Sequence, residues 1–150
     1  MNIRNSIEKI RDFALKRLIE FIGILTLIFS ILIFVALISY SPNDPNFIYP
    51  KNQDINNILG VNGSIGADFL LQSIGLISYF LPITLIFLSL AIIYKKNLTQ
   101  IVNCLFYFVC YSIIGAIFLT QFYKEAFILI TNGNGGFVGN YFYNKFFFKI

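Results

Sequence analysis

The chain has 150 residues, of which 57% are hydrophobic and 12% are charged, against about a quarter charged in an ordinary soluble domain. Its formal net charge is +4, and it contains no His, the commonest general base and metal ligand. The composition therefore excludes an ordinary soluble domain. At this length there is room for one compact helical bundle and for no separate soluble domain.

Charged and apolar residues alternate at roughly helical spacing over residues 1–18, which predicts a short amphipathic helix on the cytoplasmic face of a membrane. A contact with nucleic acid is the alternative function of its basic residues. Basic residues ahead of an apolar run normally set membrane orientation instead, so we expect a cytoplasmic N-terminus. The basic residues of this segment are Arg4, Lys9, Arg11, Lys16 and Arg17.

Three apolar runs follow, at residues 19–40, 69–94 and 101–123. A helix of about 20 apolar residues crosses the hydrocarbon core of a bilayer, so we predict an all-α membrane protein, a helical bundle with three transmembrane helices. The first run exceeds the core of about 7–15 residues in a cleaved signal peptide, which favours an uncleaved anchor. Glu20 lies at its edge, where Arg17 favours a local ion pair over a proton-carrying carboxylate.

The charges between the runs predict how the chain is threaded. Residues 41–68 contain three Asp and one Lys, whereas Lys95 and Lys96 separate the second run from the third. By the positive-inside rule we expect an external loop at 41–68, a cytoplasmic turn at 95–100 and an external or interfacial tail at 124–150.

Polar and small residues recur along the second run at spacings of 4, 3, 4 and 3, which places them on one helix face. Such residues normally face other helices inside a membrane, so we predict a helix-packing face, with a kink at Pro82. The alternative is that this face lines a pathway in a small channel or transporter subunit. The residues of this face are Asp68, Gln72, Gly75, Tyr79 and Pro82.

The third run holds both cysteines of the chain, Cys104 and Cys110. Six residues apart on a helix they point about 240° away from each other, so they can neither form a disulfide nor share a metal ion. No carboxylate pair and no metal-ligand spacing is visible in the sequence. We therefore predict no enzyme activity, no cofactor and no metal site.

Three short motifs stand at the ends of the runs. The glycines of the second motif, Gly60 and Gly63, allow two backbone segments to approach closely. A phosphate-binding loop is the alternative there, but no strand precedes it and no Lys-Ser/Thr pair follows. The third opens a Gly-rich turn before an aromatic segment that we expect at the outer interface. The motifs are Ser39-Tyr40-Ser41-Pro42-Asn43-Asp44-Pro45, then Asn57, Gly60, Gly63, Ser64, Ala67 and Asp68, then Gly135, Gly136 and Gly139.

In order and spacing, these motifs resemble those of the N-terminal membrane region of FtsK/SpoIIIE-type bacterial DNA translocases. The family has S-x-x-P-x-D-P, N-x-x-G-x-x-G-A-x-x-A-D and G-G-x-x-G at the corresponding boundaries, and the likeness covers about residues 18–145. Three positions depart from the family: Asn62 replaces a frequent Pro, Ser64 the usual Ala, and Gly66 a larger apolar residue.

The resemblance implies a multi-pass anchor in the bacterial inner membrane, which holds a DNA-pumping motor at the division septum and links cell division to chromosome segregation. The implied partners are the lipid bilayer, other division proteins and further copies of the chain in a multimer. The family region has four spans and its motor a Walker A loop, whereas this sequence has three runs and no G-x-x-x-x-G-K-[ST]. We therefore expect a fourth helix after residue 150, and contact with DNA and ATP only through a motor that these residues lack.

Overall fold

The computed structural model describes residues 3–45, 54–95, 99–123, 125, 129 and 132–147. All regular structure within these residues is helical, which confirms the expected all-α fold. The expected loop at 41–68, turn at 95–100 and tail at 124–150 lie partly outside them, and the membrane side of each stays a prediction. The elements are α1 (Ile3–Ile38), α2 (Gly60–Ile74), the 3-10 helix η1 (Gly75–Tyr79), α3 (Phe80–Lys95), α4 (Thr99–Phe122) and α5 (Gly136–Phe147).

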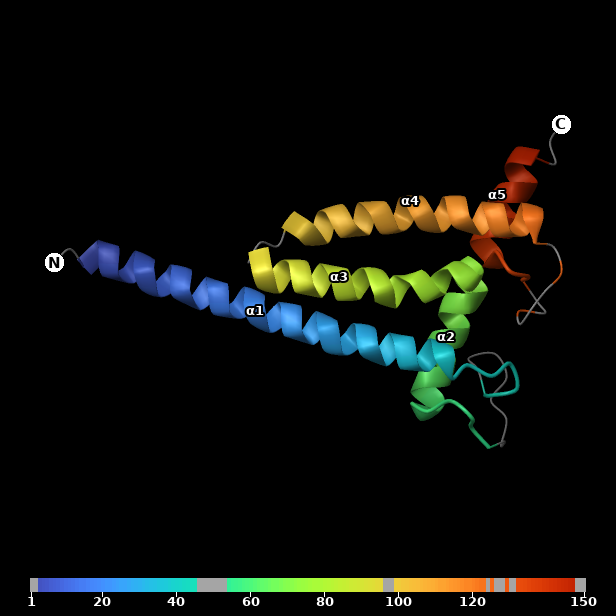
Figure 1. Cartoon of the computed structure of the whole chain (residues 1–150), viewed down its shortest axis with the longest axis horizontal. Coiled ribbons are helices and arrows are strands. Elements are labelled where there is room, and N and C mark those ends of the chain that lie inside the picture. The colour runs from blue at the N-terminus through green and yellow to red at the C-terminus, as the bar shows by residue number, and fades with distance from the viewer. Residues whose placement is uncertain are drawn as a thin grey trace.

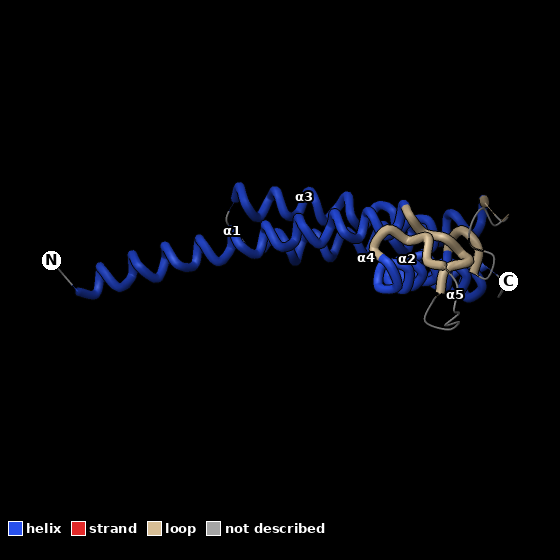
Figure 2. Tube along the Cα trace, turned by 90° about the horizontal axis from the view of Figure 1, so that it is seen from below, coloured by secondary structure: helices blue, strands red, loops and turns tan. Residues whose placement is uncertain are grey.

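The three long helices α1, α3 and α4 run side by side, with α3 between the other two and in contact with both (Figure 1). The shorter helices α2 and α5 lie across them at one end, together with the loop that follows α1 (Figures 1 and 2). We call this the loop end of the bundle. The start of α1, the end of α3 and the start of α4 lie toward the opposite, N-terminal end (Figure 1).

Three segments of the described chain are long and apolar enough to cross a membrane: Ile7–Ile38, Gly60–Lys95 and Thr99–Phe122. They correspond to the three predicted runs. The 36 residues of α1 extend over about 54 Å, which exceeds the hydrocarbon thickness of about 30 Å. The amphipathic helix expected at residues 1–18 is the first part of α1 and continues without a break into the first span. Arg17 Nη1 lies 2.6 Å from Glu20 Oε2, which confirms the expected ion pair.

The second run is not one straight helix, and the expected kink at Pro82 is wrong. α2 begins at Gly60, within the expected loop, and ends at Ile74. The chain then bends at Gly75, whose φ of 68° is open to glycine at little cost. Pro82 is the third residue of α3, where the first turn needs no backbone donor. The bend therefore lies at Gly75, and it turns α2 away from the direction of α3 (Figure 1).

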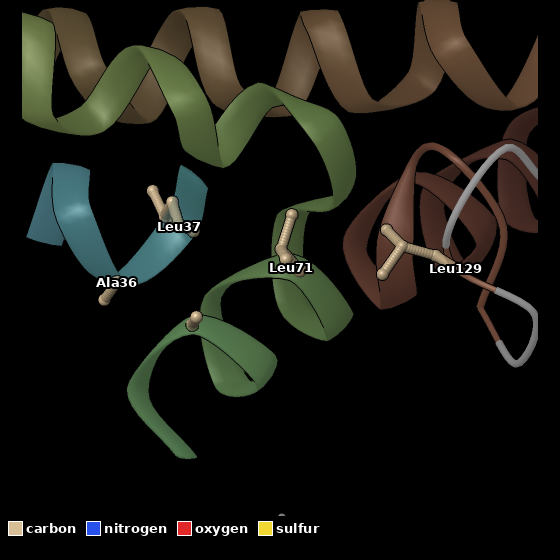
Figure 3. Close-up of a cluster of buried hydrophobic side chains, with 5 residues drawn as sticks. Ala36, Leu37, Leu71 and Leu129 are labelled. Carbon is tan, nitrogen blue, oxygen red and sulfur yellow. The ribbon is translucent and has the colours of Figure 1, made fainter. Parts of the chain in front are cut away.

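A cluster of buried apolar residues lies at the loop end, and Leu88 and Ile92 of α3 are buried farther along the bundle. In the cluster, Ala36 and Leu37 of α1 pack with Leu71 of α2 and with Leu129, which precedes α5 (Figure 3). Along the rest of the long helices most large apolar side chains are exposed. Since lipid tails are as apolar as these side chains, a membrane-spanning bundle needs no larger apolar core.

Candidate functional site

The buried carboxylate of Asp44 joins the first two motifs at the loop end. Its side chain is 4% exposed. Oδ1 accepts hydrogen bonds from the backbone N–H of Asn56 at 3.0 Å and from Asn56 Nδ2 at 3.1 Å. Oδ2 accepts one from the backbone N–H of Asn57 at 2.8 Å. Hydrogen bonds to a carboxylate are among the stronger ones in proteins, so Asp44 fixes how the chain enters the second motif.

Asn57 carries the connection onward to α1. Its Nδ2 donates to the carbonyl oxygen of Ala36 at 2.8 Å, and its Oδ1 accepts from the backbone N–H of Leu59 at 3.1 Å. A Cβ atom at position 63 would overlap Asn57 Oδ1, so only glycine leaves room for this side chain. The spacing of Asn57 and Gly63 in the motif thus has a steric reason.

The last carbonyl groups of α1 accept hydrogen bonds from the side chain of the adjoining Ser39 and from side chains of more distant segments. A helix leaves its final four carbonyl oxygens without intrahelical partners. Ser39 Oγ donates to Val35 O at 2.6 Å, and Tyr79 Oη donates to Leu37 O at 3.2 Å. Together with the bond from Asn57 to Ala36, these contacts attach the loop and η1 to the end of α1.

Two further hydrogen bonds close the network of the first two motifs. Ser39 Oγ accepts from the backbone N–H of Ile58 at 3.2 Å, and Ser64 Oγ donates to Pro45 O at 2.9 Å. Ser64 and Pro45 are both buried. Gly60 starts α2 with a φ of 66°, and a Cβ atom there would meet nothing within 4 Å. The two motifs, separate in sequence, therefore form one polar junction.

The predicted packing face is divided by the bend at Gly75. Asp68 Oδ1 accepts from Tyr40 Oη at 2.9 Å and from Gln72 Nε2 at 3.5 Å, so this part faces the end of α1. Tyr79 also reaches α1, and Pro82 is buried in α3. These residues do not share one continuous helix face. Their use as a contact with another subunit stays a prediction.

Tyr40 lies just outside the candidate span Ile7–Ile38. Burial raises the pKa of its phenol, and the hydrogen bond to Asp68 raises that pKa further. The phenol therefore keeps its proton throughout the physiological pH range and remains the donor to the carboxylate. The sequence interpretation placed Tyr40 within the first motif but assigned it no contact. Its position within that motif was the signal that could have predicted a polar role.

Gly75 brings the second motif region against the third. A Cβ atom at position 75 would overlap the carbonyl oxygen of Asn134, and one at Gly136 would overlap the backbone nitrogen of Gly75. Gly75 and Gly136 both have positive φ values, of 68° and 64°. The backbone N–H of Leu76 donates to Asn134 O at 2.9 Å. The two backbones thus touch directly, without side chains between them.

The remaining glycines of the third motif pack α5 against α4. Cβ atoms at Gly135 and Gly139 would both overlap Thr120 Oγ1, and the one at Gly139 would lie 2.5 Å from Ala116 O. Asn134 Nδ2 donates to Tyr123 O at 2.9 Å, just after the end of α4. The G-G-x-x-G pattern therefore lets α5 approach the backbone of α4.

Two asparagines that the sequence interpretation did not assign extend the network into the tail. Asn132 Nδ2 donates to Gln72 Oε1 at 2.9 Å, and Asn140 Nδ2 donates to Asn132 O at 2.7 Å. With the bond from Gln72 to Asp68, they connect the tail to α2 and the end of α1. The polar amide of Asn132 inside the Gly-rich turn was the available signal, whereas Asn140 lies within α5.

The site offers hydrogen-bonded and glycine-packed contacts, not reactive groups. Among the described residues, no three or more His, Cys, Asp or Glu side chains are grouped so that they could hold a metal ion. Cys104 and Cys110 lie within α4 as free thiols. What the arrangement can do is position the helices relative to one another and hold the boundary motifs together at the loop end.

The family comparison agrees with the motifs. The family model described as the 4TM region of DNA translocase FtsK/SpoIIIE matches residues 15–147, which confirms the resemblance drawn from the sequence. Searches of curated proteins and of solved structures find no match. The family match extends to the end of α5 at Phe147. The expectation of a fourth helix after residue 150 stays a prediction.

Proposed function

This chain belongs to the family of the FtsK/SpoIIIE 4TM region, and on that basis we propose that it is the membrane anchor and septal scaffold of an FtsK-type translocase. In this role it holds a DNA-pumping motor at the division septum and links cell division to chromosome segregation. DNA and ATP are handled by that motor, not by these residues. The inner membrane is the site of action, with the N-terminus in the cytoplasm.

The observation that carries this proposal is the junction at the loop end. All three motifs that resemble the family meet there, through Asp44, Asn57 and the contact of Gly75 with Gly136. A scaffold needs a surface whose shape does not depend on the surrounding lipid. The buried hydrogen bonds and the close backbone contacts of this junction supply such a surface.

The distribution of charge supports the proposed orientation. Arg11 and Lys16 lie near the start of α1, and Lys95 ends α3 at the same end of the bundle. Basic residues at one end favour a cytoplasmic location for that end, which directs the loop end outward. Other division proteins and further copies of the chain are the partners we propose for the loop end.

A channel or transporter subunit is the weaker candidate. Asp68, Gln72 and Tyr79 of the expected lining make hydrogen bonds within the chain, to Tyr40, Asn132 and Leu37. Side chains engaged in this way are less suited to coordinating a passing ion. Ion flux through liposomes that contain the protein, lost in Gln72→Ala, would support the channel over the scaffold.

The proposal is tested by imaging a fluorescent fusion of the chain in dividing cells of the organism that encodes it. We expect the wild type to accumulate at the septum. Asp44→Ala should reduce the septal fraction, because it removes the acceptor of the junction. The matched variant Asp54→Ala changes an exposed carboxylate of the same loop and should leave the septal fraction unchanged. An even distribution of the wild type over the cell membrane would contradict the proposal.

A further inference from the structure

The position of α2 relative to α1 sets its level in the membrane. Ala67 and Leu71 of α2 pack against Ala36 and Leu37, in the last turn of α1 (Figure 3). This turn is also where the candidate span Ile7–Ile38 ends. α2 crosses α1 here, and its direction differs from those of the three long helices (Figure 1). It therefore lies level with the end of this span and does not run parallel to the long helices.

The second run does not need α2 to cross the bilayer. η1 and α3 together extend from Gly75 to Lys95. At their usual rises per residue they cover about 34 Å, enough for a hydrocarbon core of about 30 Å. The apolar segment Gly60–Lys95 has 36 residues. The residues of α2 are therefore not needed for this segment to cross the bilayer.

The outward face of α2 differs from that of α3. The α2 residues Asn62, Gly66, Phe69 and Ser73 share the side away from the bundle, a mixture of polar, small and aromatic residues. The exposed large side chains of α3 include Ile83, Phe87 and Leu90, which are all apolar. Since a face within hydrocarbon is normally apolar throughout, the mixed face of α2 fits the boundary between head groups and acyl chains.

An apolar groove beside α2 is in keeping with this placement. It has a volume of about 490 Å³ and lies between α1, α2 and the start of α3. Its apolar walls include Leu32 of α1, Leu70 of α2 and Leu81 of α3, and Asn62, Gly66 and Phe69 of the mixed face of α2 also line it. With α2 in the membrane surface, this groove opens toward head groups and upper acyl chains.

We propose that α2 lies in the plane of the membrane at the loop end, in contact with lipid head groups and upper acyl chains. The second run then crosses the bilayer only from Gly75 to Lys95. The bend at Gly75 separates the surface helix from the spanning one. This inference does not rest on the proposed function, because it uses only helix geometry and the chemistry of the exposed faces.

The test compares two pairs of positions with the same spacing. In a Cys104→Ser, Cys110→Ser background, a nitroxide is attached to a single cysteine at Asn62 or Ser73 of α2, or at Ile83 or Tyr94 of α3. Each pair is eleven residues apart and shares a helix face. Depth is measured in lipid vesicles from collisions with oxygen and with a water-soluble nickel complex.

We expect the two α2 positions to differ in depth by less than one helical pitch, about 5 Å, and the two α3 positions by about 16 Å. A difference of about 16 Å within the α2 pair would overturn the proposal. A second reporter uses the absence of Trp from the chain. Phe69→Trp and Phe87→Trp replace rings of equal exposure, 69% each, and we expect lipids brominated near the head group to quench Phe69→Trp more strongly. Equal quenching profiles would contradict the proposal.

Discussion

The two ends of the bundle are stabilised in different ways. At the loop end, segments distant in sequence are joined by buried hydrogen bonds, such as those of Asp44 and Asn57, and by glycine contacts between backbones. Toward the N-terminal end, α1 and α4 expose most of their large apolar side chains, among them Leu25 and Phe106. The bilayer solvates this part, whereas the chain itself determines the structure of the loop end.

Because of this difference, we expect substitutions to lower the stability of the fold more at the loop end than along the lipid-facing helices. In a membrane, an apolar side chain that faces lipid contacts similar material whether or not the bundle has assembled, so its truncation changes stability little. Lipid cannot replace the hydrogen bond of a buried polar group. Nor can it make room for a side chain added to a glycine at a close backbone contact. The boundary motifs therefore mark the positions at which the fold depends on residue identity.

The largest expected effect comes from Gly75→Ala. The substitution places a Cβ atom onto the carbonyl oxygen of Asn134 and strains a residue at a φ of 68°. We expect a loss of about 3–5 kcal/mol in the free energy of unfolding, measured by SDS titration in mixed micelles. Gly133→Ala is the matched control, since its φ is 65° but nothing lies within 4 Å of the added atom. It should cost about 1 kcal/mol. Equal losses of unfolding free energy in both variants would show that the backbone contact at Gly75 does not contribute to stability.

A leucine pair on one helix compares the two regions directly. Leu37 at the loop end of α1 is 0% exposed, whereas Leu25, nearer the middle of the same helix, is 49% exposed. We expect Leu37→Ala to lower the unfolding free energy by about 3 kcal/mol and Leu25→Ala by less than about 0.5 kcal/mol. Similar losses for both, in the same SDS titration, would remove the contrast between the two regions.

A smaller effect is expected from Tyr79→Phe, which removes only the hydroxyl that donates to Leu37 O. Loss of one such hydrogen bond should cost about 1 kcal/mol. Tyr94→Phe is the control, because Tyr94 is 81% exposed at the other end of α3, and it should be neutral. A Tyr79→Phe variant as stable as the wild type would show that this cap of α1 is dispensable.

Much of the fold could be predicted from hydropathy, because the length of an apolar run reports directly whether it can cross a membrane. The bend at Gly75 could not, since the residues from Asp68 to Pro82 keep a helical spacing through it. A periodic pattern constrains which residues share a helix face but carries no information on where the axis changes direction. Gly75 combines a positive φ with a close backbone contact to Asn134 and Gly136, about 60 residues further along the chain.

The candidate site was predicted only in part, for a related reason. The motifs at Asp44, Gly63 and Gly135 stand out because their residue types are unusual at the ends of apolar runs. Which motif meets which depends on tertiary contacts that no spacing encodes. The partners of Tyr40 and Asn132, which are Asp68 and Gln72, are set by those tertiary contacts.

The central claim is that residues distant in sequence form one junction at the loop end. A double-mutant cycle between Tyr40→Phe and Asp68→Ala tests it most directly, because the two side chains meet at 2.9 Å from different motifs. Unfolding free energies of the wild type, both single variants and the double variant are measured by SDS titration. We predict a coupling energy of about 1 kcal/mol, with the double variant less destabilised than the sum of the singles. Strict additivity of the two substitutions would contradict the account.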